Sequence, residues 1–411
     1  MDTVKVQSEI GTLNSVILKR PALEIENLTP DYVGDLLFDE IPYLPQMQVE
    51  HDYFARILKN RGIEVLYLEE LMAEVLRSDA IKEDFLNAVL DESNHLDGYI
   101  LKKVYEYLMK FTAAEMVAKI MGGVRKDEQG LDISAKKSLL SMVALNYPFY
   151  VSPMPNLYFT RDPAAFIGNG VAISKMNKPA RRKESLFIKY ILENHVRFKD
   201  TNIPKWIDRD YRFSIEGGDI LVLSKNAIAI GISERTSAVA IEQIARELFA
   251  KQKDITKVLA VDIPKKRAFM HLDTVFTMLD KTLFSVHHEI FDSNGEIDSY
   301  IIERDDDDSL LNIRPFKSIE AALKETLALD EIELIPCGGT DKIAAAREQW
   351  SDGSNTLAIA PGVVVTYDRN YITNKIFRDR GIEVLEIPSS EISRGRGGPR
   401  CMSMPLYRED V

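Results

Sequence analysis

A cysteine near the carboxyl end of the sequence is the first residue whose surroundings could support chemistry. Cys401 directly follows residues 394–400, which read Arg-Gly-Arg-Gly-Gly-Pro-Arg. A thiol attacks as its thiolate, which neighbouring arginines would favour, and glycines let the backbone come close to a ligand. Many cysteines are merely small buried apolar residues, and glycine–arginine runs also occur in solvated tails. The motif alone therefore makes Cys401 a candidate nucleophile and no more.

Four ionisable residues stand shortly before predicted hairpin turns in three successive parts of the sequence. They are Asp162, Glu216, His271 and Asp273. The carboxylates of Asp162 and Asp273 could each accept paired hydrogen bonds from a planar guanidinium or amidinium group. A carboxylate such as Glu216 beside His271 would raise the pKa of the imidazole, which could then act as a general acid and base. Similar placement in successive repeats predicts one central pocket.

Each of these residues also has a structural interpretation. An aspartate before proline, as at Asp162, often caps a turn, and the Glu-Gly-Gly-Asp run that begins at Glu216 is common in plain turns. A lone histidine such as His271 is usually a satisfied core residue. Their matching positions in the repeats, together with Cys401, favour one shared catalytic site.

Arginines could supply the second half of that site. Arg235 follows a predicted strand, just before a helix that Ser237 could cap, and Arg181 and Arg182 open the helix of the preceding unit. Arginine in such loops can hold a carboxylate through two parallel hydrogen bonds. The alternative, a surface cation with weak ion pairs, is the default interpretation for Arg182 and Lys183.

Metal catalysis is disfavoured by the spacing of the possible ligands. The sequence contains no His-Glu-x-x-His or Cys-x-x-Cys motif, and the adjacent His287 and His288 would point to opposite faces of a strand. Cys337 is expected to end a buried strand. The four aspartates at 305–308 are interpreted as a solvated loop rather than a cation site.

The elements that must position these residues follow a repeated order of strand, strand, helix and strand. Alternating apolar runs with turn residues predict hairpins at 166–173, 220–230, 275–286 and 357–366. The predicted helices include 46–61, 237–251 and 374–380, and further strands are predicted at 15–19, 64–68, 258–261, 332–335 and 384–387.

No such unit can bury its apolar faces alone, so the five units are predicted to pack side by side around a common axis and close into a ring. Residues 69–148 depart from the repeat, because their periodicity is helical and they are rich in strong helix formers. We interpret them as an inserted helical subdomain of an α/β protein.

The composition is that of an ordinary globular protein, and its charge limits the partners. Of 411 residues, 45% are hydrophobic and 28% are charged, and the formal net charge is -12. This charge argues against general binding to nucleic acid or anionic membranes, and no apolar run approaches the ~18 residues that a membrane-spanning helix needs. With two cysteines and no secretion-signal pattern, a reducing cytoplasm is the expected location.

Taken together, the motifs closely resemble those of bacterial arginine deiminases of the guanidino-group-modifying superfamily. The matching segments run through essentially the whole chain, at 8–11, 26–31, 159–162, 216–219, 234–236, 270–273 and 396–405. Agmatine deiminases, amidinotransferases and dimethylarginine hydrolases share the central chemistry but fit the combined motifs less well. The resemblance implies one catalytic domain over 1–411, a five-bladed pseudo-symmetric α/β propeller of ββαβ units, with the helical insertion at 69–148.

The resemblance also implies hydrolysis of L-arginine to L-citrulline and ammonia through a covalent cysteine thiouronium intermediate, without metal or organic cofactor. Cys401 would be the nucleophile, His271 the acid and base, and Glu216 its partner, while Asp162 and Asp273 would clamp the guanidinium. The residues expected to bind the rest of the substrate are Asn156, Phe159, Arg181, Asp219, Arg235 and Arg396. The family further suggests a homo-oligomer.

Two other functions stay open at the level of the sequence. A hydrolase of agmatine, which lacks a carboxylate, would not need Arg235 and Arg396 as anion receptors. A non-enzymatic arginine-binding module would not need Cys401 together with His271.

Overall fold

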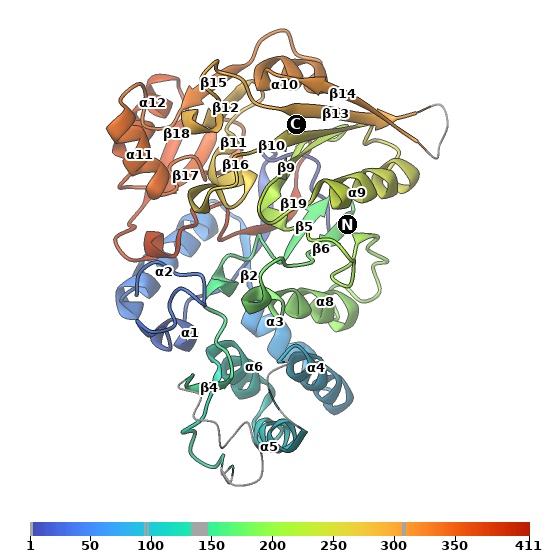
Figure 1. Ribbon diagram of the computed structural model, residues 1–411, viewed down its shortest axis with the longest axis vertical. Helices are drawn as coiled ribbons and strands as arrows, with labels where there is room; N and C mark the ends of the chain where they lie inside the picture. Colours follow the sequence, from blue (N-terminus) through green and yellow to red (C-terminus); the bar gives the residue numbers. More distant parts are fainter. Residues whose placement is uncertain (1–2, 94–95, 97, 132, 134–146, 306–309) are drawn as a thin grey trace.

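Five sheets of the described chain share one connectivity, which is that of the predicted repeat. The computed structural model describes residues 3–93, 96, 98–131, 133, 147–305 and 310–411 (Figure 1). In each of these sheets a central strand pairs antiparallel with one neighbour and parallel with the other, and a helix connects the parallel pair. The order strand, strand, helix, strand predicted from the apolar runs is therefore confirmed.

The third unit illustrates why the sequence folds in this way. Strands β8 (Ile220–Ser224) and β9 (Ala227–Ile232) form a hairpin, helix α9 (Ala238–Lys251) follows, and β10 (Lys257–Asp262) returns parallel to β9. The strands read as nearly continuous apolar runs because both of their faces are buried. Helix α9 begins where predicted, since the Ser237 hydroxyl accepts a hydrogen bond from the backbone amide of Ala240.

The other units repeat this arrangement. The second contains β5 (Ala164–Ile167), β6 (Gly170–Ile173), α8 (Glu184–Asn194) and β7 (Lys205–Ile207). The fourth contains β11 (Phe276–Met278), β12 (Leu283–Val286), α10 (Ile319–Leu327) and β15 (Glu333–Pro336). The fifth contains β16 (Leu357–Ala360), β17 (Val363–Tyr367), α12 (Tyr371–Asp379) and β18 (Glu383–Ile387).

The remaining unit is built from both ends of the chain. Strand β1 (Leu13–Leu18) pairs antiparallel with β19 (Met404–Arg408) and parallel with β2 (Glu64–Tyr67), and α2 (Leu44–Asn60) connects β1 to β2. The buried guanidinium of Arg408 links this sheet to the fifth unit, because it donates to the carbonyl of Gly11 at 2.7 Å and to that of Ala358, in β16, at 2.8 Å. The segment that carries Cys401 is thus anchored on both sides.

Two features differ from the repeat. The third sheet continues beyond β10 with β13 (Ser299–Arg304) and β14 (Leu311–Phe316), a ribbon that extends outward in Figure 1 and that the sequence analysis did not predict. His287 and His288 do not lie on a strand, because β12 ends at Val286 and His288 begins a short 3-10 turn. The expected strand before Cys337 is present as β15, and Cys337 is buried, but within this strand Ile335 alone is buried. Residues 306–308 of the aspartate run lie outside the described residues.

Helices dominate the described chain between β2 and β4 (Phe149–Val151). They are α3 (Leu68–Val75), α4 (Asp79–Asp91), α5 (Gly98–Leu108) and α6 (Ala113–Gly122), after which the short β3 (Val124–Arg125) pairs with β4. They gather at one end of the molecule, beside α8 (Figure 1). Aromatic contacts join the two parts, since the Phe85 ring lies 5.1 Å from that of Phe187 and 5.0 Å from that of Tyr190.

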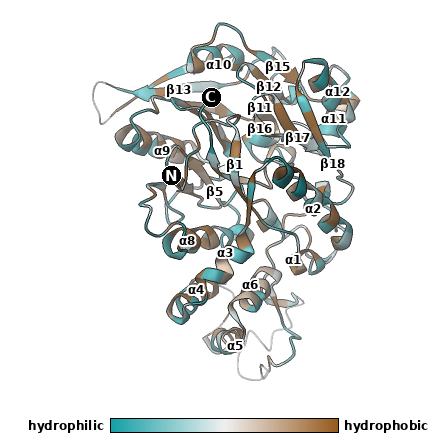
Figure 2. Ribbon diagram, turned by 180° about the vertical axis from the view of Figure 1, so that it is seen from behind, coloured by the Kyte–Doolittle hydropathy of each residue, from teal (hydrophilic) through white to brown (hydrophobic). Residues whose placement is uncertain are grey.

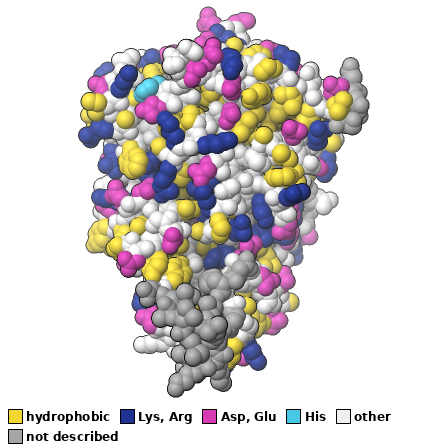
Figure 3. Space-filling view, viewed as in Figure 1, with side chains coloured by type: hydrophobic (Ala, Val, Ile, Leu, Met, Phe, Trp, Pro, Cys, Tyr) yellow, Lys and Arg dark blue, Asp and Glu magenta, His cyan; other side chains and the backbone are white. Residues whose placement is uncertain are grey.

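Apolar residues fill the space between the sheets and their helices. Figure 2 shows hydrophobic residues concentrated in the strands and hydrophilic ones on the outward faces of helices. On the face seen in Figure 3, acidic and basic side chains are interspersed and form no extended patch of one sign. Within the described residues, none of the helices combines the length and apolar character needed to cross a membrane.

Candidate active site

Short turns that lead into the first strand of successive sheets bring the predicted polar residues together. Glu216 directly precedes the 3-10 turn η3 (Gly217–Asp219) before β8, and His271 directly precedes η5 (Leu272–Thr274) before β11. Asp162 lies between the turn η1 (Pro155–Tyr158) and β5. Position 218 accommodates only glycine, because a Cβ there would lie 2.6 Å from His271 Nδ1 and 2.8 Å from Asp162 Oδ1. The equivalent positions of the repeats therefore meet, as the sequence predicted.

The imidazole of His271 is held between two carboxylates. Its Nε2 lies 2.8 Å from Glu216 Oε2, and its Nδ1 lies 3.7 Å from Asp162 Oδ1. Asp219 fixes the turn below the ring, since its Oδ1 accepts from the Leu272 amide at 2.8 Å and its Oδ2 from the Ser233 hydroxyl at 2.7 Å. Asp219 thus orients His271 in this structure, and both of its oxygens are engaged by the chain.

The electrostatics of this cluster favour a protonated imidazole. Burial alone would lower the pKa of His271, but the carboxylates of Asp162, Glu216 and Asp219 outweigh burial and raise it to about 9. Burial would likewise raise the pKa of Glu216, yet its hydrogen bond to His271 and the charge of Arg235 hold it well below its usual range. The pair is therefore an imidazolium with a carboxylate near neutral pH.

The thiol of Cys401 lies in the same buried region. Its Sγ is 3.5 Å from Asp273 Oδ2 and 3.2 Å from Asn355 Nδ2, and the Cys401 carbonyl accepts from the Arg161 amide at 3.1 Å. Burial raises the pKa of this thiol well above its usual range, and the charges of nearby aspartates raise it further. The cysteine is therefore a neutral thiol in the ligand-free protein.

The arginines before Cys401 do not make it a thiolate in the ligand-free protein, although Arg400 acts in that direction, because burial and the nearby carboxylates outweigh it. Arg400 donates to Asp273 at 2.7 Å and to Glu9 at 2.9 Å. Arg394 pairs with Glu40 and Glu391, toward the surface. Of the three arginines, Arg400 is the one whose charge lowers the pKa of the thiol, and burial and the carboxylates outweigh it. Proximity in sequence did not reveal these pairings.

Asp162 and Asp273 share a feature that suits a cationic ligand. In each, Oδ2 accepts a hydrogen bond from an arginine of this chain, Arg181 at 2.6 Å and Arg400 at 2.7 Å respectively. In each, Oδ1 is buried and has no hydrogen-bond partner among the described residues. Buried acceptors without donors are costly, so two such oxygens in one site indicate a place for a donor-rich group.

Unpaired donors occur in the same site. Arg235 lies with Nη1 3.8 Å from Glu216 Oε2, and its Nε and Nη1 lack a hydrogen-bond partner within the described part of the chain. Arg396 adopts a left-handed backbone with φ of 64° and stacks its guanidinium 3.5 Å above the ring of Trp350. Its Nε and Nη1 are equally without an acceptor in the described structure. Both side chains could receive an anionic group.

Arg181, rather than Arg182, faces the site, but its guanidinium is engaged. It donates to Glu184 Oε2 at 2.7 Å, to Asp162 and to the Asn156 carbonyl at 3.3 Å. The Asn156 amide in turn donates to the Leu36 carbonyl at 2.8 Å. In this structure Arg181 therefore organises Asp162 and the turn of Asn156.

Phe159 explains the glycines of the loop before Cys401. Its ring lies 4.0 Å from that of Tyr158, and a Cβ at Gly397 would overlap it, while a Cβ at Gly395 would overlap the Tyr158 hydroxyl. The loop and these aromatic rings are in direct contact. The glycines therefore serve close packing here, in addition to the backbone freedom that the sequence suggested.

The sequence analysis missed several residues of the site. Asn355, Asp352, Glu9 and Glu184 are all buried beside the predicted residues. Burial raises the pKa of Asp352 to about 7, and its Oδ2 has no hydrogen-bond partner among the described residues. The Asp-Gly-Ser-Asn run that contains Asp352 and Asn355 signalled a turn, but nothing in its composition signalled a site.

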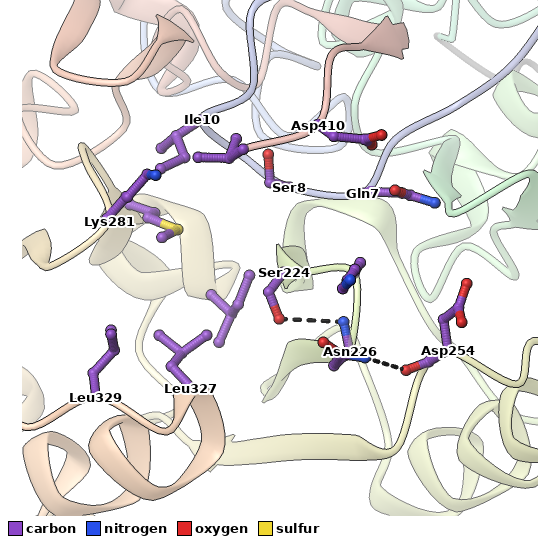
Figure 4. A pocket seen from close by; sticks show the side chains of 14 residues that line it. Gln7, Ser8, Ile10, Ser224, Asn226, Asp254, Lys281, Leu327, Leu329 and Asp410 are labelled. Atoms are coloured by element: carbon purple, nitrogen blue, oxygen red, sulfur yellow. Dashed lines mark hydrogen bonds between the residues drawn. The ribbon is translucent and has the colours of Figure 1, made fainter.

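One pocket reaches the site at Arg396, and another lies away from it. A small one of about 100 Å³ lies at Arg396, beside Trp350 and Arg394. A larger pocket of about 530 Å³ lies among the hairpin turns at the other ends of the strands, where Ser224 and Lys281 face the two chain ends (Figure 4). None of the predicted site residues lines the larger pocket.

In the described residues, no group of three or more histidines, cysteines and acidic residues is arranged to hold a metal ion.

Solved structures define the class of fold. An amidinotransferase from Microseira wollei in the saxitoxin biosynthetic pathway matches with a TM-score of 0.55 and 13% identity, covering 100% of this chain and 98% of that one. The DDAH of Pseudomonas aeruginosa, in complex with citrulline, matches with a TM-score of 0.52 and 15% identity over 96% and 99% of the two chains. The chain thus has the mixed α/β fold of these proteins.

Sequence comparison identifies the family within that class. The family model described as arginine deiminase matches residues 34–408. A relative from Bacillus cytotoxicus named arginine deiminase is 58% identical over 408 residues, which cover 99% of both chains. One of the same name from Listeria monocytogenes is 52% identical and covers 99% of this chain and 98% of its own. The chain belongs to the arginine deiminase family.

Replacing Glu216 with glutamine should lower the pKa of His271 below about 9, because burial remains while a hydrogen-bonded carboxylate is lost. The raised pKa of His271 means that its protonated form stabilises the folded protein. This contribution to the free energy of unfolding is fully present below about pH 6.5 and is lost as the pH rises through about 9. The free energy of unfolding of Glu216→Gln should therefore fall below that of the wild type by about 1–3 kcal/mol near pH 6, and by less above about pH 9.

An NMR titration of the imidazole reports the pKa, and urea unfolding at both pH values reports the stability. Glu74→Gln is the matched control, because Glu74 lies 3.0 Å from His195 Nε2 but is itself half exposed, where an ion pair contributes little. An unchanged titration of His271 in Glu216→Gln would contradict the assigned pairing.

Proposed function

We propose that this chain is an arginine deiminase that hydrolyses L-arginine to L-citrulline and ammonia in arginine catabolism. The observation that carries the proposal is one buried site in which the thiol of Cys401, the imidazolium of His271 and the free oxygens of Asp162 and Asp273 converge. Membership of the arginine deiminase family supports the same conclusion. An agmatine hydrolase would leave the donors of Arg235 and Arg396 without an anion to bind.

The guanidinium of the substrate would lie between Asp162 and Asp273. Each aspartate offers a buried Oδ1 without a donor, and the planar guanidinium carries five N–H groups that match carboxylate geometry. Such binding would satisfy both acceptors and place the guanidinium carbon near Cys401 Sγ, which lies 3.5 Å from Asp273 Oδ2. Fixing the two reacting groups in this way supplies much of the catalytic advantage.

The amino-acid end of the substrate would be held by the arginines. Arg235 and Arg396 have unpaired donors for the carboxylate. Asn156, Arg181 and Phe159 would supply the remaining contacts, and they are linked because the Asn156 carbonyl accepts from the Arg181 guanidinium and from the Phe159 amide. Most of the Arg181 donors already bind Asp162, Glu184 and the Asn156 carbonyl. Asp219 would act through His271, whose turn it holds.

The chemistry would proceed in two halves. When the substrate cation binds, the Cys401 thiol loses its proton to solvent, and the thiolate adds to the guanidinium carbon. His271, which is an imidazolium at neutral pH, gives its proton to the departing nitrogen. Ammonia leaves as the carbon–nitrogen bond breaks, and a cysteine thiouronium remains. The neutral imidazole then removes a proton from water, whose oxygen adds to the same carbon. The carbon–sulfur bond breaks, the added hydroxyl loses its proton to solvent as the carbonyl forms, and citrulline and the thiolate are released.

We further propose that the five sheets are arranged as blades around one axis. Residues 69–148 would form a helical subdomain inserted in a single catalytic domain, 1–411. The shared connectivity of five sheets and the meeting of their leading turns support it. We also propose that the protein works in the cytoplasm as a homo-oligomer. Its net charge of -12 disfavours a nucleic-acid partner. A light-scattering mass equal to one chain would reject the oligomer.

Cys401→Ala should abolish the release of citrulline and ammonia from L-arginine, because no covalent intermediate can form. Turnover should fall by about a millionfold or to the detection limit. Cys337→Ala is the matched control, since Cys337 is the second buried cysteine, directly follows strand β15, and has its thiol beside Thr373 and Gly353. Substantial turnover by Cys401→Ala would reject covalent catalysis.

Arg396→Ala should impair the use of L-arginine more than that of agmatine, because only arginine carries the carboxylate that Arg396 would bind. We expect kcat/KM for arginine to fall at least about tenfold further than that for agmatine. Arg394→Ala tests the effect of charge alone, as Arg394 pairs with Glu40 and Glu391 instead. Equal losses for both substrates would count against a carboxylate contact, and a wild-type preference for agmatine would reject the substrate assignment.

A bound cation should promote the ionisation of Cys401. Burial and the charges of Asp273 and Asp162 raise the pKa of the thiol in the ligand-free protein, and a guanidinium between these aspartates would offset their field. Thiolate absorbance, recorded in Cys337→Ala so that one thiol remains, should appear at lower pH when a cationic arginine analogue that is not turned over is present. An unchanged titration would contradict substrate-assisted activation.

A further inference from the structure

The side-chain amide of Asn355 joins the two parts of the site that hold the nucleophile. Its Oδ1 accepts a hydrogen bond from the Cys401 amide at 3.0 Å, and its Nδ2 donates to the Asp273 carbonyl at 2.9 Å. The same Nδ2 donates to Cys401 Sγ at 3.2 Å. Asn355 is fully buried, so water does not compete for these contacts.

The partners of Asn355 fix the orientation of its amide. A backbone N–H can only donate, so the oxygen must face the amide of Cys401. A backbone carbonyl can only accept, so the NH₂ group must face Asp273. One hydrogen of the NH₂ group goes to that carbonyl, and the other is directed at the sulfur. The atom that meets the nucleophile is thus a donor.

Local backbone geometry holds Asn355 in this place. Asp352 adopts a left-handed conformation with φ of 57°, and its carbonyl accepts from the Asn355 amide at 2.9 Å. Gly398, in the loop before Cys401, packs against Asn355 so closely that a Cβ would overlap the Asn355 carbonyl oxygen. The turn and the loop therefore fit each other at a position that only glycine allows.

The charges around the sulfur explain why a neutral donor is suited to this position. The groups that act on Cys401 are the carboxylates of Asp273, Asp162 and Asp352, the guanidinium of Arg400, and the hydroxyls of Tyr158 and Tyr367. An additional cation beside the sulfur would stabilise a thiolate but would also repel the cationic guanidinium of a substrate. An amide hydrogen bond stabilises the thiolate without adding charge.

We propose that Asn355 is a catalytic residue that stabilises the thiolate of Cys401 through its amide N–H and keeps the sulfur beside Asp273. The inference rests on the proposed function. In that reaction the hydrogen bond would act twice, first on the attacking thiolate and again on the thiolate that leaves when the carbon–sulfur bond of the intermediate breaks. Asn355 therefore stabilises charge on sulfur at both ends of the covalent step.

Asn355→Asp tests this role, because aspartate has the same shape but presents an oxygen instead of an N–H to the sulfur. The rate of alkylation of Cys401 by iodoacetamide is measured against pH without substrate, in Cys337→Ala so that one thiol remains. We expect the rate profile to move upward by at least about one pH unit and the rate near pH 8 to fall about tenfold. For L-arginine, kcat should fall about a hundredfold while KM changes less than about threefold.

Asn374→Ala, measured in the same Cys337→Ala background, is the matched control. Asn374 is as buried as Asn355 and also donates two hydrogen bonds, to Tyr367 and Glu386, so its loss should leave the alkylation profile of Cys401 unchanged. A loss of kcat in Asn355→Asp with an unchanged alkylation profile would overturn the proposal and leave only a structural role. If Asn355→Asp does not fold, Asn355→Ser is measured in the same way, and an unchanged profile there overturns the proposal equally.

The failure of the proposed function would be visible separately. If the unmodified protein does not hydrolyse L-arginine, the assigned reaction is rejected, whereas the alkylation profiles still report whether Asn355 acts on the sulfur.

Discussion

The site depends on the compensation of buried charge. Glu216 and Asp162 flank the imidazolium of His271, Arg400 binds both Glu9 and Asp273, and Arg181 binds Asp162 together with Glu184. Ionised groups can be removed from water only when partners of opposite charge and hydrogen bonds replace the solvent. Because these partners come from different sheets, the packing of the sheets and the ionisation of the site require each other.

Within this network, the few groups left without partners define the ligand. One oxygen on each of Asp162 and Asp273 lacks a donor, and two nitrogens on each of Arg235 and Arg396 lack an acceptor among the described residues. Unpaired acceptors and unpaired donors in one site suit a molecule that carries both a planar cation and an anion. L-Arginine has these properties, which is why the proposed function follows from the unmet hydrogen bonds as well as from the family.

Much of the fold and of the candidate site could be predicted from the sequence, and the reason is repetition. Apolar runs and turn residues recur with each unit, so strand order and the equivalence of Asp162, Glu216 and His271 are local signals. The ribbon β13–β14 was not predicted, because it breaks the repeat. Asn355 and Glu9 were not predicted either, since their roles depend on contacts between residues far apart in the sequence. For the same reason the effect of Arg400 on Cys401 could not be inferred from their adjacency.

The pairing of β1 with β19 has a consequence for how the site is assembled. This contact joins residues separated by nearly the whole chain, for example Leu13 and Arg408, whereas the hairpins of the other units join close neighbours in sequence. Contacts of long sequence separation carry the largest entropy cost of loop closure. The nucleophile lies immediately before β19, so a chain in which every other sheet has already formed still has its sulfur unplaced. Catalytic competence therefore requires the two ends of the chain to pair, and a molecule that lacks this one pairing would be structured yet chemically inert.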